Sequence, residues 1–194
     1  MSDISEENNI WNQIGSEING GNTSNWASRG SSSLSNDGTV LAVGAPDNAD
    51  NGLNAGKASI FTYNTASSSW IQVGNDIKGQ NAGDYFGISI KLSDNGSIVA
   101  IGANGVDENG NDSGQVQIFE NIANVWTQVG SEINGVSEKD LSGSTIDLSG
   151  DGSILAIGAQ LNDDNGEDSG QVRIFKNESG TWKQLGQTLS LIHI

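Results

Sequence analysis

The sequence of 194 residues contains no cysteine, a single proline and a single histidine. Without cysteine, the chain cannot form a disulfide framework or a thiolate metal site. The histidine, His193, is the penultimate residue, so a Ser-His-Asp triad or a histidine metal centre has no candidate elsewhere. Adjacent carboxylates such as Asp163 and Asp164 fall in a predicted turn, where no apolar wall would raise a pKa. We therefore predict that the chain is not an enzyme.

Basic residues and long apolar runs are also scarce. Eight Lys and Arg residues stand against 24 Asp and Glu, which gives a net charge of −16. Nucleic acids and anionic membranes attract clustered Lys and Arg, so the sequence argues against both as partners. No apolar run reaches about 18 residues, which argues against membrane insertion. The segment after Met1, SDISEENN, has neither the basic nor the apolar region of a signal peptide.

The sequence does contain a repeated frame. Trp11, Trp70, Trp126 and Trp182 each open the motif W-x-Q-[IVL]-G, at intervals of 56 to 59 residues. A period of this length is typical of propellers and solenoids, in which each unit buries its apolar face against the next. The repeat therefore indicates the fold before any single motif is considered.

The unit that starts near residue 78 is predicted to contain four short strands. Gly87 to Ser93 alternates apolar and polar residues, as a half-buried strand does. An Asn-Gly turn then leads into Ser97 to Ala103, which is apolar on both faces and so should be covered on both sides. Gly114 to Glu120 supplies a third strand and the segment around Trp126 a fourth, with Ile133 near its end.

This pattern predicts an all-β fold, namely a β-propeller fragment of about three four-stranded antiparallel blades. A β-solenoid is the alternative. The second strands should pack face to face at Ala42, Ala100 and Ala156, and their Gly-Ala ends indicate a close approach of backbones. The predicted boundaries are a preceding fourth strand with its connection in 1–29, and blades in 30–77, 78–133 and 134–188.

Several of these motifs resemble the FG-GAP repeat of integrin α-subunits and of tandem arrays in secreted bacterial surface proteins. Phe86-Gly87 is followed by Gly102-Ala103, and the first copy reads Gly44-Ala45-Pro46. The chain is most similar to the bacterial arrays, in which L-S-x-D-G, A-[IV]-G-A and W-x-Q-[VIL]-G recur in this order. The resemblance implies a propeller blade and a secreted or cell-surface location.

The resemblance does not extend to the family's calcium site. Integrin-type blades carry D-x-D-x-D-G-x-x-D before the second strand, whereas this chain has short turns with one or two carboxylates. No cofactor is therefore expected. Calcium remains an alternative that the sequence does not favour, with weak candidate ligands in one later loop: Asp163, Asn165 and Asp168.

Acidic residues gather instead in the loops between the second and third strands. Candidate binding residues there are Asp107, Glu108, Asp112, Asp163, Asp164 and Asp168. The simpler interpretation is that Asn-Gly sets each turn and the carboxylates bond to their own backbone or to water. Trp26 lies outside the tryptophan register and is either a ligand contact or a linker residue packed on a neighbouring blade. In antiparallel blades these loops share one face with the connections from strand four to the next strand one.

The resemblance implies a non-catalytic extracellular or cell-surface module that binds a protein or glycan in adhesion. The alternative is a structural spacer within a larger surface protein or secreted enzyme. The partners expected are an unknown protein or glycan and the neighbouring blades of a complete propeller. The last predicted segment is 189–194: LSLIHI leaves the repeat after Leu189-Ser190 and resembles a translated sequencing-adapter end, and the alternative is a genuine apolar tail.

Overall fold

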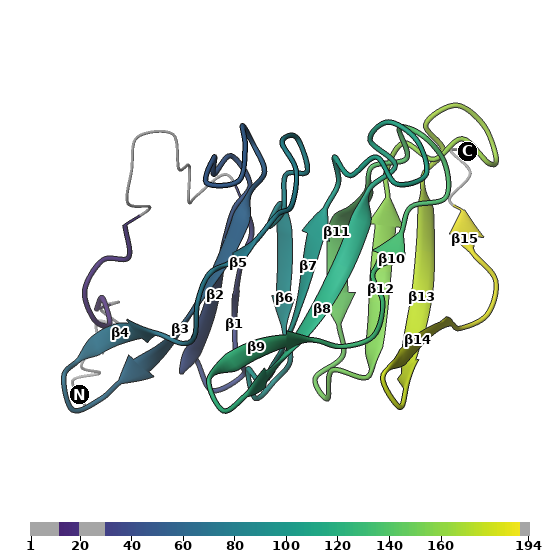
Figure 1. Cartoon of the computed structure of the whole chain (residues 1–194). Helices are drawn as coiled ribbons and strands as arrows, with labels where there is room; N and C mark the ends of the chain where they lie inside the picture. Colours follow the sequence, from purple (N-terminus) through teal and green to yellow (C-terminus); the bar gives the residue numbers. More distant parts are fainter. Residues whose placement is uncertain (1–11, 20–29, 191–194) are drawn as a thin grey trace, which may run out of the picture.

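The strands follow the repeat frame and form three successive antiparallel sheets, each a meander (Figure 1). The computed structural model describes residues 12–19 and 30–190. Sheet 1 contains β1 Ser32–Leu34, β2 Val40–Ala45, β3 Lys57–Asn64, β4 Ser69–Gln72 and β5 Ile77–Lys78. Sheet 2 contains β6 Ser89–Leu92, β7 Ile98–Ala103, β8 Gln115–Ile122, β9 Val125–Gln128 and β10 Ile133–Asn134. Sheet 3 contains β11 Ser142–Leu148, β12 Ile154–Ala159, β13 Gln171–Glu178, β14 Thr181–Gln184 and β15 Leu189–Ser190.

Each sheet has four main strands in sequential order, and the prediction of four-stranded antiparallel blades is confirmed. The innermost strands approach one another, because β1 contacts β6 and β6 contacts β11. The outermost strands β4, β9 and β14 do not pack on one another to a comparable extent. The sheets therefore diverge outward, as propeller blades do, and the array is not closed. In the described part of the chain, no helix has the length and apolarity needed to cross a membrane.

One detail of the strand prediction was wrong. The sequence placed Ile133 near the end of the fourth strand, but it lies in β10, a separate short strand that pairs with β8. Gly130, with φ of +74°, follows the end of β9 at Gln128 and allows the chain to turn back toward β8. Each sheet therefore gains a short fifth strand, β5, β10 or β15, next to its third strand.

Two apolar cores lie between the sheets. The first contains Ala42 and Ile60 of sheet 1 and Val99 and Ile101 of sheet 2, and each of these is at most 1% exposed. The second joins sheets 2 and 3 in the same way, and its members are Ala100, Val116, Ile118, Ile133, Leu148, Leu155, Ile157 and Phe175. Adjacent residues of β7 thus point into different cores, which is why this strand is apolar on both faces.

The Gly-Ala ends of the second strands lie where backbones approach closely, as predicted. A Cβ added to Gly44 would lie 1.9 Å from the carbonyl oxygen of Gly87, and one on Gly102 would lie 2.2 Å from that of Gly143. Only glycine permits this packing. Ala42 and Ala100, two residues before these glycines, are fully buried in the first and second core. Ala156 is half-buried, because the described chain has no fourth sheet to cover it.

The phenylalanine of Phe86-Gly87 inserts into the preceding sheet. Its backbone pairs in parallel with Gly56, its amide donates to the carbonyl of Ala55 at 3.1 Å, and its ring is 2% exposed. In the third copy Ser142 takes the same place and pairs with Gly114. The serine shows that the backbone contact, rather than the aromatic ring, is common to both junctions.

The repeated tryptophans also connect one unit to the next. The indole Nε1–H of Trp126 donates to the carbonyl of Val73 at 3.0 Å, and that of Trp182 donates to the carbonyl of Val129 at 3.0 Å. Trp70 donates to Ile14 at 3.1 Å in the same way, although residues 12–19 form no strand. Trp126 and Trp182 are half-buried and pack against the two cores, so each contributes to a core and also bonds to the previous unit.

Candidate functional site

The loops between the second and third strands lie beside the connections that lead to the next sheet, as predicted (Figure 1). The amide of Tyr85 donates to the carbonyl of Asn54 at 2.9 Å, and the amide of Leu141 donates to that of Asp112 at 3.1 Å. These bonds join the loop of one unit to the connection that follows it. We call this surface the long-loop face; it consists of residues 46–56, 79–87, 104–114, 135–143 and 160–170.

The acidic loops of sheets 2 and 3 close on themselves. Asp107 Oδ1 accepts the amide of Asp112 at 2.8 Å, and Asp163 Oδ1 accepts the amide of Asp168 at 2.7 Å. Asp112 and Asp168 have φ of 54° and 52°, a region that Asp tolerates better than most residues. These carboxylates thus bond to their own backbone, as the simpler interpretation expected. Their outer surfaces remain in water, because Asp107 and Asp163 are both exposed.

The other candidate carboxylates differ in what they contact. Glu108 is exposed, and Asp164 Oδ2 accepts a bond from Gln171 Nε2 at 2.8 Å while remaining exposed. Asn111 Nδ2 donates to Asp112 Oδ2 at 2.7 Å. The loop tips therefore present several ionised groups to solvent without bringing them to a common point.

The asparagine of each Asn-Gly pair has a structural role. Asn51 Nδ2 donates to the carbonyl of Gly79 at 2.9 Å, and Asn109 Nδ2 donates to that of Gly135 at 2.7 Å. Asn165 occupies the same repeat position in sheet 3. Its sequence-based interpretation as a metal ligand therefore competes with a role in holding the loop to the connection.

Two further acids of this face are buried and hold the connections in place. Asp84 Oδ2 accepts the amides of Gln80 and Asn81 at 3.1 and 2.8 Å. Asp140 Oδ2 accepts the amide of Ser137 at 3.0 Å and the Asn162 amide group at 3.1 Å. Because Asp84 and Asp140 are 6% and 2% exposed, neither is available to a ligand.

A buried arginine lies beneath this part of the face. Arg173 Nη2 donates to the carbonyl of Asn134 at 2.8 Å and to Ser142 Oγ at 3.1 Å, and its guanidinium lies over the ring of Phe175. Burial lowers the pKa of Arg173, and the nearby charge of Asp140 opposes this shift. The contacts connect sheets 2 and 3 and so fix the geometry of the loops above them.

In sheet 1, one of the two acids of the loop is paired with a lysine. Lys78 Nζ lies 2.8 Å from Asp50 Oδ2, and the hydrogen bond from Lys78 lowers the pKa of Asp50. The loops of sheets 2 and 3 carry more acidic residues and, in the described chain, no ion pair of this kind. Free negative charge is therefore concentrated at the sheet 2 and sheet 3 end of the long-loop face.

The same end of the face contains a pocket of about 330 Å³. Its lining comes from the loop of sheet 2 and from the connections on either side: Tyr85, Ile88, Asn104, Gly105, Asp112 and Leu141. Asp112 is the one lining residue among the predicted candidates. Tyr85 and Leu141 were missed because they fill the position before Phe86-Gly87 and Ser142-Gly143, which the repeat pattern alone marks as structural. In the structure these two large residues have φ of 53° and 54°, which is unusual for such side chains and often marks a functional position. Only the backbone angles carry this signal, so the sequence could not provide it.

Among the described residues, no group of three or more acidic or histidine side chains is arranged to hold a metal ion. The short turns use their side chains internally. Asp151 Oδ1 accepts the hydroxyls of Ser149 and Ser153 and the amide of Ser153, and Asn95 makes the corresponding bonds in sheet 2. The other proposed contact, Trp26, lies outside the described residues.

The comparisons with known proteins agree with this geometry. Residues 78–119 match the model of the FG-GAP repeat. The chain contains an FG-GAP repeat. The matched FG-GAP segment runs from β5 to Phe119 in β8, and so includes Phe86-Gly87 and the whole acidic loop of sheet 2. The resemblance seen in the sequence is confirmed for this segment. No curated protein matches the chain.

Solved structures show the same propeller-type fold at low sequence identity. Hydrazine synthase from Kuenenia stuttgartiensis is 16% identical, with a TM-score of 0.52, and the match covers 83% of this chain and 36% of that one. Sqt1 from Saccharomyces cerevisiae is 17% identical, with a TM-score of 0.51, over 83% of this chain and 35% of that one. The chain therefore spans about a third of the length of these structures, and the likeness concerns the fold alone.

Proposed function

We propose that this chain is a non-catalytic binding module of an extracellular or cell-surface protein, and that it binds a protein or glycan partner in adhesion. The observation that carries the proposal is the pocket formed by the loop of sheet 2 and the connections on either side, in the same loop as the exposed carboxylates of Asp107 and Glu108. Long loops held by a rigid framework are common sites of recognition. The FG-GAP repeat supports the module and its location outside the cell.

The partner should present basic or polyhydroxylated groups to this face. Asp107, Glu108, Asp163 and Asp164 are exposed, and the net charge of −16 adds a long-range negative field. Such a field accelerates the association of a cationic partner, and salt screens it over a Debye length of about 8 Å. Association should therefore slow as the ionic strength rises.

A structural spacer is the second candidate, and one observation favours it. Many polar side chains of the long-loop face form hydrogen bonds within the protein and are not free to bind a partner. Examples are Asn51, Asn109, Asp84 and Asp140. A spacer would bind nothing at this face, which separates the two proposals by experiment.

The test is binding of the labelled chain to an array of extracellular-matrix proteins and glycans. We expect a saturable ligand whose binding falls about tenfold when four exposed acids are neutralised, as charge pairs at interfaces contribute on this scale. The variant is Asp107→Asn, Glu108→Gln, Asp163→Asn and Asp164→Asn. The amide oxygens retain the acceptor bonds, so the fold should persist.

The matched control neutralises the opposite face through Asp37→Asn, Asp94→Asn and Asp151→Asn. Binding that survives the first variant but not the control would place the interface on the short turns and contradict the proposal. Absence of any saturable ligand on the array would favour the spacer.

A further inference from the structure

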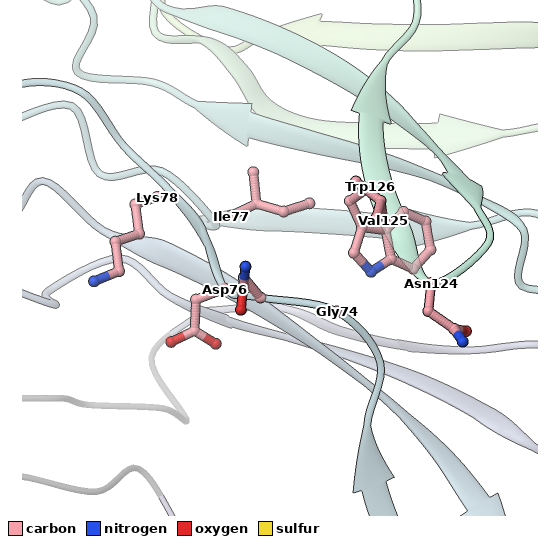
Figure 2. A pocket seen from close by; sticks show the side chains of 8 residues that line it. Gly74, Asp76, Ile77, Lys78, Asn124, Val125 and Trp126 are labelled. Carbon is pink, nitrogen blue, oxygen red and sulfur yellow. The ribbon is translucent and has the colours of Figure 1, made fainter.

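A groove of about 300 Å³ opens between sheets 1 and 2, and its lining residues lie outside the long-loop face, which it adjoins at Lys78 (Figure 2). One wall is the segment that links β4 to β5, and the other is the start of β9. Its lining residues are Gly74, Asn75, Asp76, Ile77, Lys78, Asn124, Val125 and Trp126. A second hollow, of about 270 Å³, shares Asn124 and Trp126 with the groove. The indole therefore borders two adjoining spaces.

Trp126 is held rigidly in this position. Its Nε1–H donates to the carbonyl of Val73, and its ring packs against the core between sheets 1 and 2. The polar edge of the indole is thus already used, and what remains for a ligand is its apolar surface. Val125, which is 61% exposed, extends this surface at the rim. A preformed flat apolar surface costs little conformational entropy on binding.

The repeat supplies an internal comparison, because the same tryptophan stands at each junction between units. Beside Trp126 lie Asn75 and Asn124, whereas Trp182 has Ser131 and Gly180 at the equivalent positions. Asn75 and Asn124 are exposed, and neither side chain makes a hydrogen bond to another residue of the described chain. The two amides are therefore available to a ligand and are absent from the next junction, where Thr181 and Asn134 also stand in place of Val125 and Lys78.

The charges that line the groove are already neutralised. Lys57 Nζ bonds to Asp76 Oδ2 at 2.8 Å, and Ser59 and Gln72 donate to the other carboxylate oxygen. Burial alone would raise the pKa of Asp76, but these bonds and the charge of Lys57 lower it below the ordinary value. Lys78 is paired with Asp50 on the other side. The groove thus offers an indole surface and two amides, with little unpaired charge.

We propose that this groove binds a neutral carbohydrate, with a pyranose ring against Trp126 and vicinal hydroxyls bonded to the amides of Asn75 and Asn124. A hydroxyl both donates and accepts, and so does a carboxamide, whereas a charged ligand would find no unpaired counter-charge. An apolar platform with a few placed polar groups is the usual composition of a small-ligand site. This site lies outside the long-loop face and does not depend on the function proposed for that face.

The test titrates the whole chain with four neutral probes: cellohexaose, laminarihexaose, mannohexaose and chitohexaose. Calorimetry measures affinity and stoichiometry, and the indole Nε1–H resonances in ¹⁵N NMR report the tryptophan involved. We expect one of the probes to bind once per chain and to shift the resonance of Trp126 rather than that of Trp182.

Two reciprocal variants use the next junction as the control. Asn75→Ser with Asn124→Gly gives the first junction the residues of the second, and should weaken binding about tenfold or more through the lost hydrogen bonds. Ser131→Asn with Gly180→Asn should create a second site and raise the stoichiometry toward two. An Asn side chain has room at Gly180, because an added Cβ would have no neighbour within 4 Å; the φ of +86° strains the backbone, but Asn tolerates positive φ better than most residues, and Asn124 has φ of 67° at the equivalent position.

A further pair of variants separates an effect on binding from an effect on stability. Trp126→Leu and Trp182→Leu each remove one indole bond between units and should lower the melting temperature similarly, but only Trp126→Leu should abolish binding. The neutralised long-loop variant described above should bind the probe as the unchanged chain does, so failure of one proposal leaves the other intact.

Four results would overturn the inference. These are no saturable binding of any neutral probe at millimolar concentration, tighter binding of a heparin hexasaccharide, binding of a proline-rich decapeptide instead of a sugar, and affinity unchanged by Asn75→Ser with Asn124→Gly.

Discussion

Sheets 2 and 3 have almost the same second strand but different surroundings. Ile98–Ala103 reads IVAIGA and is buried at every position after the first, whereas Ile154–Ala159 reads ILAIGA and is buried only at alternate positions. Ala100 is fully buried and Ala156 is not. The difference lies in the neighbour, because sheet 3 covers one face of sheet 2 and no described sheet covers the corresponding face of sheet 3. In a repeat array, the burial of a residue therefore depends on whether a neighbouring unit covers it, and not only on the sequence of its own unit.

The largest expected difference between the sheets is the loss of stability when a glycine of the second strand is replaced by alanine. Gly102→Ala would place a Cβ 2.2 Å from the backbone oxygen of Gly143, which cannot move without shifting sheet 3. We expect a loss of stability at or above the upper end of the roughly 1–3 kcal/mol seen for overpacking. Gly158→Ala meets only the hydroxyl of Thr145, which is exposed and can rotate, and should cost less than about 1 kcal/mol.

Urea unfolding of the two glycine variants measures this difference. Equal losses would mean that the sheets do not pack as closely at Gly102 as the structure shows.

The next largest effect is expected at the alanines. Ala100→Leu should overpack the second core and cost roughly 1–3 kcal/mol, whereas Ala156→Leu extends from a half-buried position and should cost well under 1 kcal/mol. Chemical melts of the pair test the comparison directly. An unchanged melt for Ala100→Leu would count strongly against a strand that is buried on both faces.

The hairpin turns of the two sheets should differ in their response to acid. Hydrogen bonds from Ser149 and Ser153 lower the pKa of Asp151 to about 2, whereas Asn95 makes the same bonds without titrating. Because the folded pKa is depressed, the stabilisation is complete above the unfolded value of about 3.9 and is lost as the pH falls through about 2.

We therefore expect Asp151→Asn to leave stability at pH 7 nearly unchanged and to reduce the loss of stability between pH 4 and about 2. Urea melts across this range provide the measurement, and Asn95→Asp is the matched control, which should add acid sensitivity to sheet 2. Parallel pH profiles for Asp151→Asn and the unchanged chain would show that the turn bonds do not depend on the ionised form.

The smallest expected effect is that of calcium. The loop of sheet 3 has more carboxylates than that of sheet 1, yet Asp163 is bonded to the amide of Asp168 and no metal-binding group is found in the described chain. Calorimetric titration with calcium should give weak binding or none, and Asp163→Ala with Asp168→Ala should change nothing. Submillimolar binding that this double variant abolishes would reverse the interpretation.

The repeat period, the alternation of Gly87 to Ser93 and the doubly apolar second strand were sufficient to predict the all-β fold and the antiparallel sheets. These features depend on local sequence, since side-chain alternation and turn residues act over a few positions. Two strand details required the structure: the short fifth strand, which forms because Gly130 turns the chain back toward β8, and the insertion of Phe86 into the preceding sheet.

The sequence by itself determined the units, their strand pattern, the loops that share a face and the excess of acidic residues. Only the tertiary structure decided which acids are exposed and which are buried. Asp107 and Asp84 belong to the same face, but one lies in solvent and the other binds two backbone amides out of contact with water. It also decided that Trp126 bonds to Val73 and lies beside Asn75 and Asn124. The packing of one sheet on another brings these groups together. They are far apart in the chain, so a local sequence pattern cannot predict that they meet.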